Sequence, residues 1–145
     1  STGSERKILE LSRDEKNSKI KAFENALTQS QLNKARAAVR EVRMSEQVEE
    51  YLVQIILATR NSDKYGGNLS DWLEFGASPR ATIALDICSK SLAWLDNRNF
   101  VTPDDIRSIA HDVLRHRLIL SFEAEANGIS SDQVVDELLK VVPSA

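Results

Sequence analysis

Two stretches of the sequence carry the same helix-start signature, and this repetition constrains the fold more than any other feature. In each stretch a hydroxyl residue precedes a proline, as Ser78-Pro79 and as Thr102-Pro103. A hydroxyl side chain suits the N-cap, and proline suits the first helical position because the amide it lacks would have no partner there. Apolar residues recur at helical spacing after both pairs. The chain is therefore expected to be mainly helical.

Helical periodicity is present in five segments, two of which also begin at predicted capping residues, Ser45 and the box from Ser130 to Gln133. The predicted helices span residues 30–42, 46–59, 79–96, 103–116 and 131–142. A short helical turn at 5–11 adds a sixth element, whereas 39–44 and 118–120 are compatible with short extended segments. The predicted fold is all-α in the main: a bundle of five or six helices with at most a short β element.

The segments that join the predicted helices differ in character. Residues 12–18 lack apolar side chains and are predicted to form a linker or an exposed turn. Residues 61–75 form a long polar connection, which is either a covering flap or a turn of helix. The helix at 79–96 has apolar residues around most of its circumference. We therefore expect this helix at the centre of the bundle, with Cys88 buried.

The charge pattern excludes a dedicated nucleic-acid binder. Lys and Arg number 19 and Asp and Glu 22, which gives a net charge of −3 with the signs interspersed, whereas such binders carry a basic patch. The longest apolar stretch, residues 51–58, is far shorter than the roughly 18 residues of a membrane span. A single cysteine excludes an internal disulfide, and the N-terminus lacks the order of a signal peptide. These features predict a cytoplasmic protein without membrane contact.

No enzyme site is visible in the sequence. No glycine is followed by lysine, so the phosphate loop G-x-x-x-x-G-K-[ST] is absent. His111 and His116 lie five residues apart, about 140° around a helix, unlike the i, i+4 pair of a zinc helix. The acidic pair Asp104-Asp105 lies in the first turn of a predicted helix, where the macrodipole explains it. We predict no catalytic residue and no metal site within the chain.

Arg80 is the one side chain with a candidate binding role. It occupies the second position of a predicted helix, where its guanidinium lies near the free amides of the first turn and together they suit an anion such as phosphate. The competing interpretation is an arginine that pairs with Glu74 or caps a neighbouring carbonyl group. The local sequence favours neither interpretation over the other.

Three short motifs follow one another along the chain. They are Gly76-Ala77-Ser78-Pro79-Arg80-Ala81, Val101-Thr102-Pro103-Asp104-Asp105-Ile106 and Val113-Leu114-Arg115-His116-Arg117-Leu118. In this order they resemble the C-terminal lid domain of the MoxR-type AAA+ ATPases, as do residues 51–60 and 123–143. The resemblance covers roughly residues 30–143, and several motifs in one order are more specific than any one of them.

The resemblance implies that the chain is one lobe of a larger protein. Residues 1–29 would comprise the end of an ATPase core and a linker, and residues 30–145 the helical lid. Residues 1–4 are small and polar, as is typical of a cloning remnant. ATP and Mg²⁺ would be cofactors of the full-length ATPase, whereas the lid alone would neither bind them tightly nor hydrolyse ATP.

The resemblance also gives Arg80 a role, because it matches the sensor-2 arginine that points at the γ-phosphate in this family. Its support would be the helix N-terminus formed by Gly76, Ala77, Ser78 and Pro79. Loss of the phosphate contact would couple hydrolysis to rotation of the lid about residues 12–18. Comparison with the magnesium-chelatase branch leaves open whether Arg80 acts in its own subunit or in a neighbouring one.

Three further arginines match family positions, and for them a solvated or carbonyl-capping role is the better interpretation. These residues are Arg60, Arg115 and Arg117.

The function implied is that of an ATPase that couples ATP binding and hydrolysis to the remodelling or maturation of partner proteins. Its partners would be its own ATPase core, the neighbouring subunits of a hexameric ring and proteins with von Willebrand factor A domains. Two alternatives remain open. One is a stand-alone helical module that binds a protein through residues 72–75, and the other is the lid of a magnesium-chelatase-like ATPase.

Overall fold

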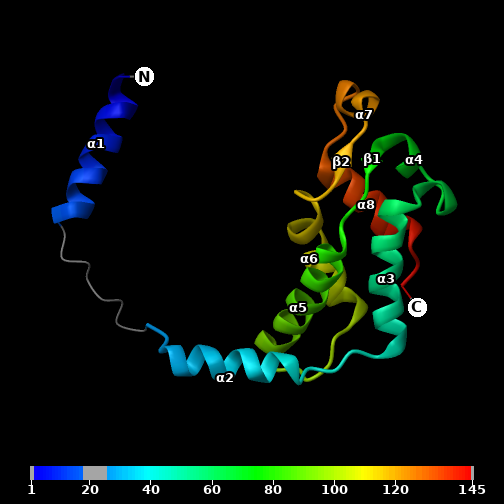
Figure 1. Cartoon of the computed structure of the whole chain (residues 1–145), viewed down its shortest axis with the longest axis horizontal. Coiled ribbons are helices and arrows are strands. Elements are labelled where there is room, and N and C mark those ends of the chain that lie inside the picture. The colour runs from blue at the N-terminus through cyan, green and yellow to red at the C-terminus, as the bar shows by residue number, and fades with distance from the viewer. Residues whose placement is uncertain (1, 18–25, 145) are drawn as a thin grey trace. The chain divides into compact units, whose positions relative to one another are not determined.

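The computed structural model describes residues 2–17 and 26–144, which divide into two compact units, 1–33 and 34–145. The first unit contains helix α1 (Thr2–Asn17; Figure 1). The linker predicted at 12–18 is wrong for residues 12–17, which continue this helix, whereas Ser18 lies outside the described residues. A run of Arg, Asp, Glu and Lys is polar, but these residue types tolerate a helix well and no Gly or Pro interrupts it.

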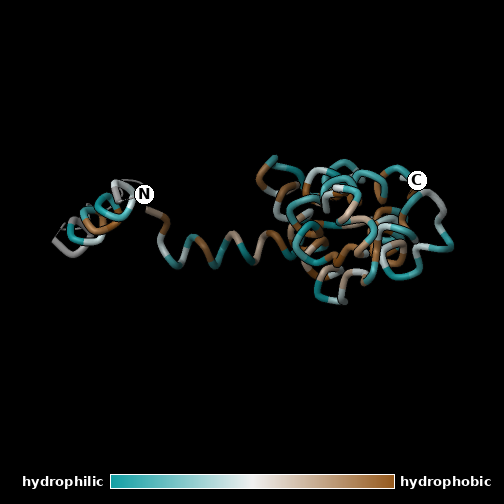
Figure 2. Tube along the Cα trace, turned by 90° about the horizontal axis from the view of Figure 1, so that it is seen from above, coloured by the Kyte–Doolittle hydropathy of each residue, from teal (hydrophilic) through white to brown (hydrophobic). Residues whose placement is uncertain are grey.

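Helix α2 (Gln29–Arg40) begins near the predicted position. Thr28 precedes it, and its hydroxyl accepts a hydrogen bond from the Gln31 amide (3.2 Å) while the Gln31 side chain accepts one from the Thr28 amide (2.8 Å). Brown and teal alternate along this helix in Figure 2, as an apolar stripe at helical spacing requires. Beyond it, Arg43 forms an isolated parallel bridge with Phe100. This bridge confirms the extended ending of the segment.

Helices α3 (Glu46–Arg60) and α8 (Ser131–Val141) begin at the predicted caps. The Ser45 hydroxyl accepts a hydrogen bond from the Val48 amide (3.3 Å). Ser130 and Gln133 exchange side-chain-to-backbone hydrogen bonds of 2.8 and 3.3 Å, which is a complete capping box. Both helix starts are confirmed.

Helices α5 (Pro79–Leu95) and α6 (Pro103–Leu114) share the most extensive helix pairing of the second unit. The buried stripe of α5 repeats every fourth residue: Ala81, Leu85, Ser89 and Ala93. The expectation that α5 is central, with Cys88 buried, is wrong, since Cys88, Ile83 and Ile87 are all exposed. Helix α5 therefore covers the core with one narrow face, in which three of the four buried residues are small.

The connection at residues 61–75 contains elements of its own rather than one flap. It consists of a 3₁₀ turn η1 (Ser62–Lys64), helix α4 (Leu69–Trp72) and strand β1 (Leu73–Phe75). Strand β1 pairs antiparallel with β2 (Ile119–Leu120), and the short helix α7 (Phe122–Ala126) follows β2. The mainly α fold with one short β element is confirmed.

The core of the second unit draws on α3, α4, α5, α6 and α8. Its largest fully buried side chains are Ile55, Leu69, Leu85, Ile106, Leu114, Leu138, Val134, Val135 and Val142. None of the helices within residues 2–17 and 26–144 has the length and apolar character that a bilayer crossing needs.

Candidate functional site

The segment that leads into α5 is held by the C-terminal end of α3. The Thr59 hydroxyl accepts a hydrogen bond from the Ala77 amide (3.0 Å) and donates one to the Ile56 carbonyl oxygen (2.7 Å). Nε of Arg60 donates to the carbonyl oxygen of Ala77 (2.7 Å). Thr59 and Ala77 are both buried. The backbone N–H and C=O of Ala77 are therefore both fixed by α3 before α5 begins.

Gly76 makes this approach possible. A Cβ atom at this position would lie 2.2 Å from the Thr59 carbonyl oxygen and 2.9 Å from the Arg60 amide nitrogen, both of which are backbone atoms. No side chain fits in that space without moving one of the two segments. A close contact between the two backbones is therefore the physical reason for a glycine at this position.

Ser78 and Pro79 start α5 with the predicted backbone geometry. Ser78 has the extended conformation of an N-cap (φ −73°, ψ 167°), and Pro79 follows at the first helical position. The Ser78 hydroxyl, however, makes no capping hydrogen bond, so that part of the capping prediction is wrong. The first turn of α5 also contains no acidic residue. The positive end of this helix is thus left without an anionic partner from its own turn.

Arg80 is exposed at this helix start. Within the described part of the chain its guanidinium makes no hydrogen bond and no ion pair, and the pairing with Glu74 considered from the sequence is not formed. A free cation beside a helix N-terminus that no acid occupies is suited to bind an anionic oxygen. The backbone below it is held in place by Thr59 and Arg60.

Comparison with known proteins identifies the domain that carries this arrangement. The chaperone MoxR1 of Mycobacterium tuberculosis is 39% identical over 94 residues, which cover 64% of this chain and 25% of that protein. The family model described as the AAA lid domain matches residues 70–138, a range that includes the whole segment from Gly76 to Arg80. Residues 70–138 form an AAA lid domain, and the chain is similar to proteins named MoxR.

Two further relatives extend the similarity of the lid domain over almost the whole chain. The uncharacterised protein YeaC of Bacillus subtilis is 32% identical over 132 residues, which cover 91% of this chain and 39% of that protein. The crystal structure of a candidate ATPase from Cytophaga hutchinsonii superposes with a TM-score of 0.80 at 33% identity, covering 94% of this chain and 42% of the other. The matched part of the chain therefore spans between 25% and 42% of the length of these relatives.

The other arginines at family positions have structural partners in the lid domain. Arg60 binds the Ala77 carbonyl group as described, and Arg117 donates to the carbonyl oxygen of Val113. Arg115 forms ion pairs with Asp132 (2.9 Å) and Asp112 (3.4 Å). For Arg60 and Arg117 the carbonyl-capping interpretation is confirmed, and Arg60 additionally turns out to position the segment before Arg80.

The sequence did not indicate the strongest ion pair of the lid domain, which closes the start of α6. Arg98 binds both oxygens of Asp105, NH1 to Oδ2 at 2.8 Å and NH2 to Oδ1 at 2.6 Å. Asp105 also accepts hydrogen bonds from the amide (2.7 Å) and hydroxyl (2.9 Å) of Thr102. Burial opposes ionisation of Asp105, but these hydrogen bonds outweigh it and hold the pKa of its carboxyl below the usual range.

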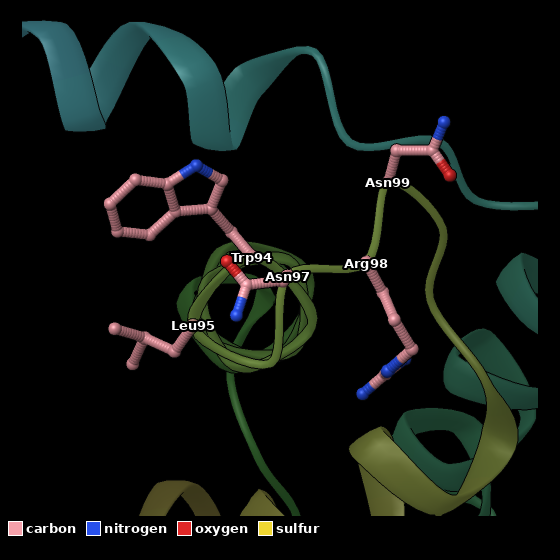
Figure 3. Close-up of a pocket in the computed structure, with 5 residues that line it drawn as sticks. All are labelled: Trp94, Leu95, Asn97, Arg98 and Asn99. Carbon is pink, nitrogen blue, oxygen red and sulfur yellow. The ribbon is translucent and has the colours of Figure 1, made fainter.

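The position of Arg98 comes from the way α5 ends. Asn97 adopts a left-handed conformation (φ 58°), and the amides of Asn97 and Arg98 bond back to the carbonyl oxygens of Trp94 and Ala93, which is a Schellman motif. Figure 3 shows the side chain of Arg98 pointing away from Trp94 and Leu95. These residues line a shallow surface pocket with Asn97 and Asn99. The only charged group of that pocket is already bound to Asp105.

The histidines and Cys88 form no site in the lid domain. His111 bonds to Asp136 (Nε2 to Oδ1, 2.9 Å), and His116 is exposed on the turn after α6. Among residues 2–17 and 26–144, no three His, Cys, Asp or Glu side chains are grouped so that they would hold a metal ion. Of the surface at 72–75 that the sequence offered for protein binding, Leu73 is buried and Trp72 half-buried, and Phe75 is exposed.

Proposed function

We propose that this chain is the lid of a MoxR-like ATPase and that Arg80 is its sensor-2 arginine. The observation that carries the proposal is the unpartnered guanidinium of Arg80 on a helix start that α3 holds through Thr59 and Arg60. In this role Arg80 contacts the γ-phosphate of ATP bound to the ATPase core. It thereby reports whether that phosphate is present.

The residues at the start of α5 fit a nucleotide phosphate. ATP supplies a terminal phosphate group with anionic oxygens, and Mg²⁺ would be held by the ATPase core. Arg80 offers charged donors, and its own backbone amide forms no backbone hydrogen bond. The first turn contains no carboxylate that would repel the phosphate. A charge-assisted hydrogen bond of this kind contributes about 1.5–3 kcal/mol, and one that strengthens as charge develops accelerates phosphoryl transfer.

The lid would then transmit the nucleotide state to the rest of the protein. Because Ala77 is fixed by α3, a force on Arg80 acts on the bundle as a whole rather than on a loose loop. The proposed partners are the ATPase core of the same chain and the neighbouring subunits of a ring, with proteins containing von Willebrand factor A domains as the remodelled or maturing partners. We propose a cytoplasmic location for this assembly.

The test is the Arg80→Ala substitution in the intact ATPase that carries this lid. We expect ATP hydrolysis to fall about 10- to 100-fold, the factor that a lost charge-assisted hydrogen bond predicts. The preference for ATP over ADP should fall as well, because only ATP has the group that Arg80 contacts. Steady-state turnover and the two nucleotide affinities give the measurement.

Two variants serve as controls for that experiment. Arg80→Lys keeps the charge but loses the planar donor pair, so an intermediate rate is expected. Arg36→Ala removes another exposed arginine, on α2, and should leave turnover unchanged. If ATP hydrolysis and the preference for ATP over ADP are both unchanged in the Arg80→Ala protein, Arg80 is not the sensor-2 arginine.

A further inference from the structure

The elements β1, β2 and α7 lie together at one end of the helical unit (Figure 1), and three large apolar side chains on them are exposed. They are Phe75, Ile119 and Phe122, with 61, 57 and 84% of their surface exposed, and we call them the apolar tip. Phe75 and Ile119 are partners across the two-stranded sheet, so their side chains lie close together. Phe122 begins α7 two residues after β2 ends.

The backbone that presents the apolar tip is held firmly. The Ser121 amide donates to the Trp72 carbonyl oxygen (2.9 Å), and the Ser121 hydroxyl donates to that of Asp71 (2.5 Å). The same hydroxyl accepts a hydrogen bond from the Ala124 amide (3.1 Å), which caps α7. Phe122 is thus exposed by a capped and anchored turn, and not by fraying of a helix end. A fixed apolar surface that faces water is typical of an interaction site.

Four carboxylates lie in or directly beside the elements that form the apolar tip. Glu74 precedes Phe75 in β1 and lies on the other face of the strand. Glu123 and Glu125 lie in α7, where Glu125 shares a face with Phe122. Asp71 precedes β1, at the residue to which Ser121 bonds. All four carboxylates are exposed, and within the described residues none of them forms an ion pair. Acidic charge is therefore free to act on whatever approaches the apolar tip.

The basic side chains nearest along the chain do not neutralise these acids. Arg117, two residues before Ile119, donates to the Val113 carbonyl oxygen. Arg80 and His116 are exposed and bind none of the four carboxylates. The exposed apolar residues of α5 differ in this respect, because Ile83 and Ile87 neighbour Asp86, whose charge is paired with Lys90 (2.8 Å). The apolar tip thus combines exposed apolar side chains with exposed carboxylates that form no ion pair within the described residues.

From this combination we infer that the apolar tip docks a segment of a partner protein in which Lys or Arg residues are interleaved with large apolar side chains. Apolar anchors on such a segment would cover Phe75, Ile119 and Phe122, and its cations would meet the four carboxylates. The same carboxylates repel nucleic acids and anionic lipid surfaces. This inference goes beyond the sensor role and does not depend on Arg80.

The test uses the 145-residue chain and three synthetic peptides of equal length. The first alternates Lys with Leu and Phe, the second replaces each Lys by Glu, and the third replaces each Leu and Phe by Ser. Backbone amide shifts in NMR titrations locate the binding, and the fluorescence anisotropy of labelled peptides gives the affinity. We expect the first peptide to bind about tenfold or more tightly than either other one, with shifts concentrated in β1, β2 and α7. Its affinity should fall as salt increases.

Substitutions then assign the contacts. Phe122→Ser should lower the affinity for the first peptide about tenfold, and the double substitution Glu123→Lys with Glu125→Lys should lower it by a similar factor. Ile83→Ser, which removes another exposed apolar residue, on α5, should leave the affinity unchanged. Because Phe122 and Ile83 are both largely exposed, these variants should fold, and circular dichroism melting curves verify it. The same peptide measured on the intact ATPase tests whether the surface is free in the whole protein.

Several outcomes would overturn the inference. Equal binding of the three peptides, or binding that Phe122→Ser does not change, means that the apolar tip is not the site. Self-association of the chain that Phe122→Ser abolishes assigns the surface to a second copy. If the peptide binds the 145-residue chain but not the intact ATPase, the apolar tip is covered by the ATPase core in the whole protein. Tighter binding of vesicles with anionic lipid than of the first peptide assigns it to a membrane.

Discussion

The two helix starts that share one sequence signature are completed in opposite ways. At α6 the first turn is capped by side chains. Asp105 accepts a hydrogen bond from the Thr102 amide and forms a bidentate ion pair with Arg98. At α5 the Ser78 hydroxyl caps nothing and the first turn has no acid. The start of α5 is held instead by the Thr59 and Arg60 side chains, which bond to the Ala77 backbone, and by the close approach of Gly76 to the α3 backbone. A helix start whose amide donors are bonded to the protein's own side chains contributes to stability. A helix start that is held by a neighbouring helix but leaves its amide donors uncapped can bind an external anion.

The largest effect is expected from breaking the backbone anchor of α5. In Gly76→Ala the new Cβ would meet the Thr59 carbonyl oxygen at 2.2 Å, so α3 and the α5 start must separate. We expect the free energy of unfolding to fall by about 3 kcal/mol in urea titrations. Gly66→Ala is the control, because Gly66 has a positive φ but open space, and should cost only about 1 kcal/mol. Equal costs at the two positions would show that the α3 contact is not what anchors α5.

The side-chain closure of α6 should rank second. Asp105→Ala removes the partner of Arg98 and the acceptor for Thr102, and we expect a loss of about 2 kcal/mol in the free energy of unfolding. Asp104→Ala removes the exposed acid of the same turn and should cost about 0.5 kcal/mol, the macrodipole contribution alone. The two variants separate the contribution of the ion pair from that of the helix dipole. Similar losses of unfolding free energy in both would mean that the helix dipole alone explains the acids of this turn.

A smaller effect should appear in the pH dependence. The pKa of Asp105 is lower in the folded protein than the ordinary value of 3.8, so its stabilisation is complete above 3.8. It is lost as the pH falls below 3.8 and through the lower folded-state pKa. The urea midpoint of the wild-type protein should therefore fall more steeply below that pH than the midpoint of Asp105→Asn. Parallel curves would mean that Asp105 is not preferentially ionised in the fold.

The smallest effect is expected from the open side of α5. Ser78→Ala and Arg80→Ala each remove a group without a partner in the described part of the chain, so each should change the free energy of unfolding by less than about 0.5 kcal/mol. Thermal melts of the 145-residue chain measure this. A loss above about 1 kcal/mol for Arg80→Ala would give this arginine a structural role and remove the contrast between the two helix starts.

Local signals in the sequence were enough to predict most helix boundaries. The caps at Ser45 and Ser130 depend on hydrogen bonds within four residues, and both are present. The extended segments at Arg43 and Ile119 were also indicated by short apolar runs. Residues 12–17 were mispredicted because a lack of apolar side chains was taken as a lack of helix.

Features that depend on distant contacts could not be predicted. The ion pair of Arg98 and Asp105 joins the turn after α5 to the first turn of α6, and the left-handed Asn97 sets the shape of that turn. The role of Thr59 requires knowing that α3 ends beside Ala77, 18 residues further along the chain. Periodicity also failed on α5, because apolar residues on three sides of a helix do not show which side is buried, and Cys88 lies on an exposed one. The position of Arg80 at the start of α5 was predicted, whereas the hydrogen bonds of Thr59 and Arg60 to Ala77 were not.

The hydrogen bonds that Thr59 and Arg60 make to the backbone of Ala77 affect hydrogen exchange of the Ala77 amide with solvent. Its amide lies outside any helix, yet it is buried and bonded to a hydroxyl whose own proton is bonded to α3. Hydrogen exchange at that amide requires the contact with α3 to open, so its rate follows the opening of this junction alone. The exchange rate of the Ala77 amide proton thus reports how often the start of α5, which carries Arg80, separates from α3.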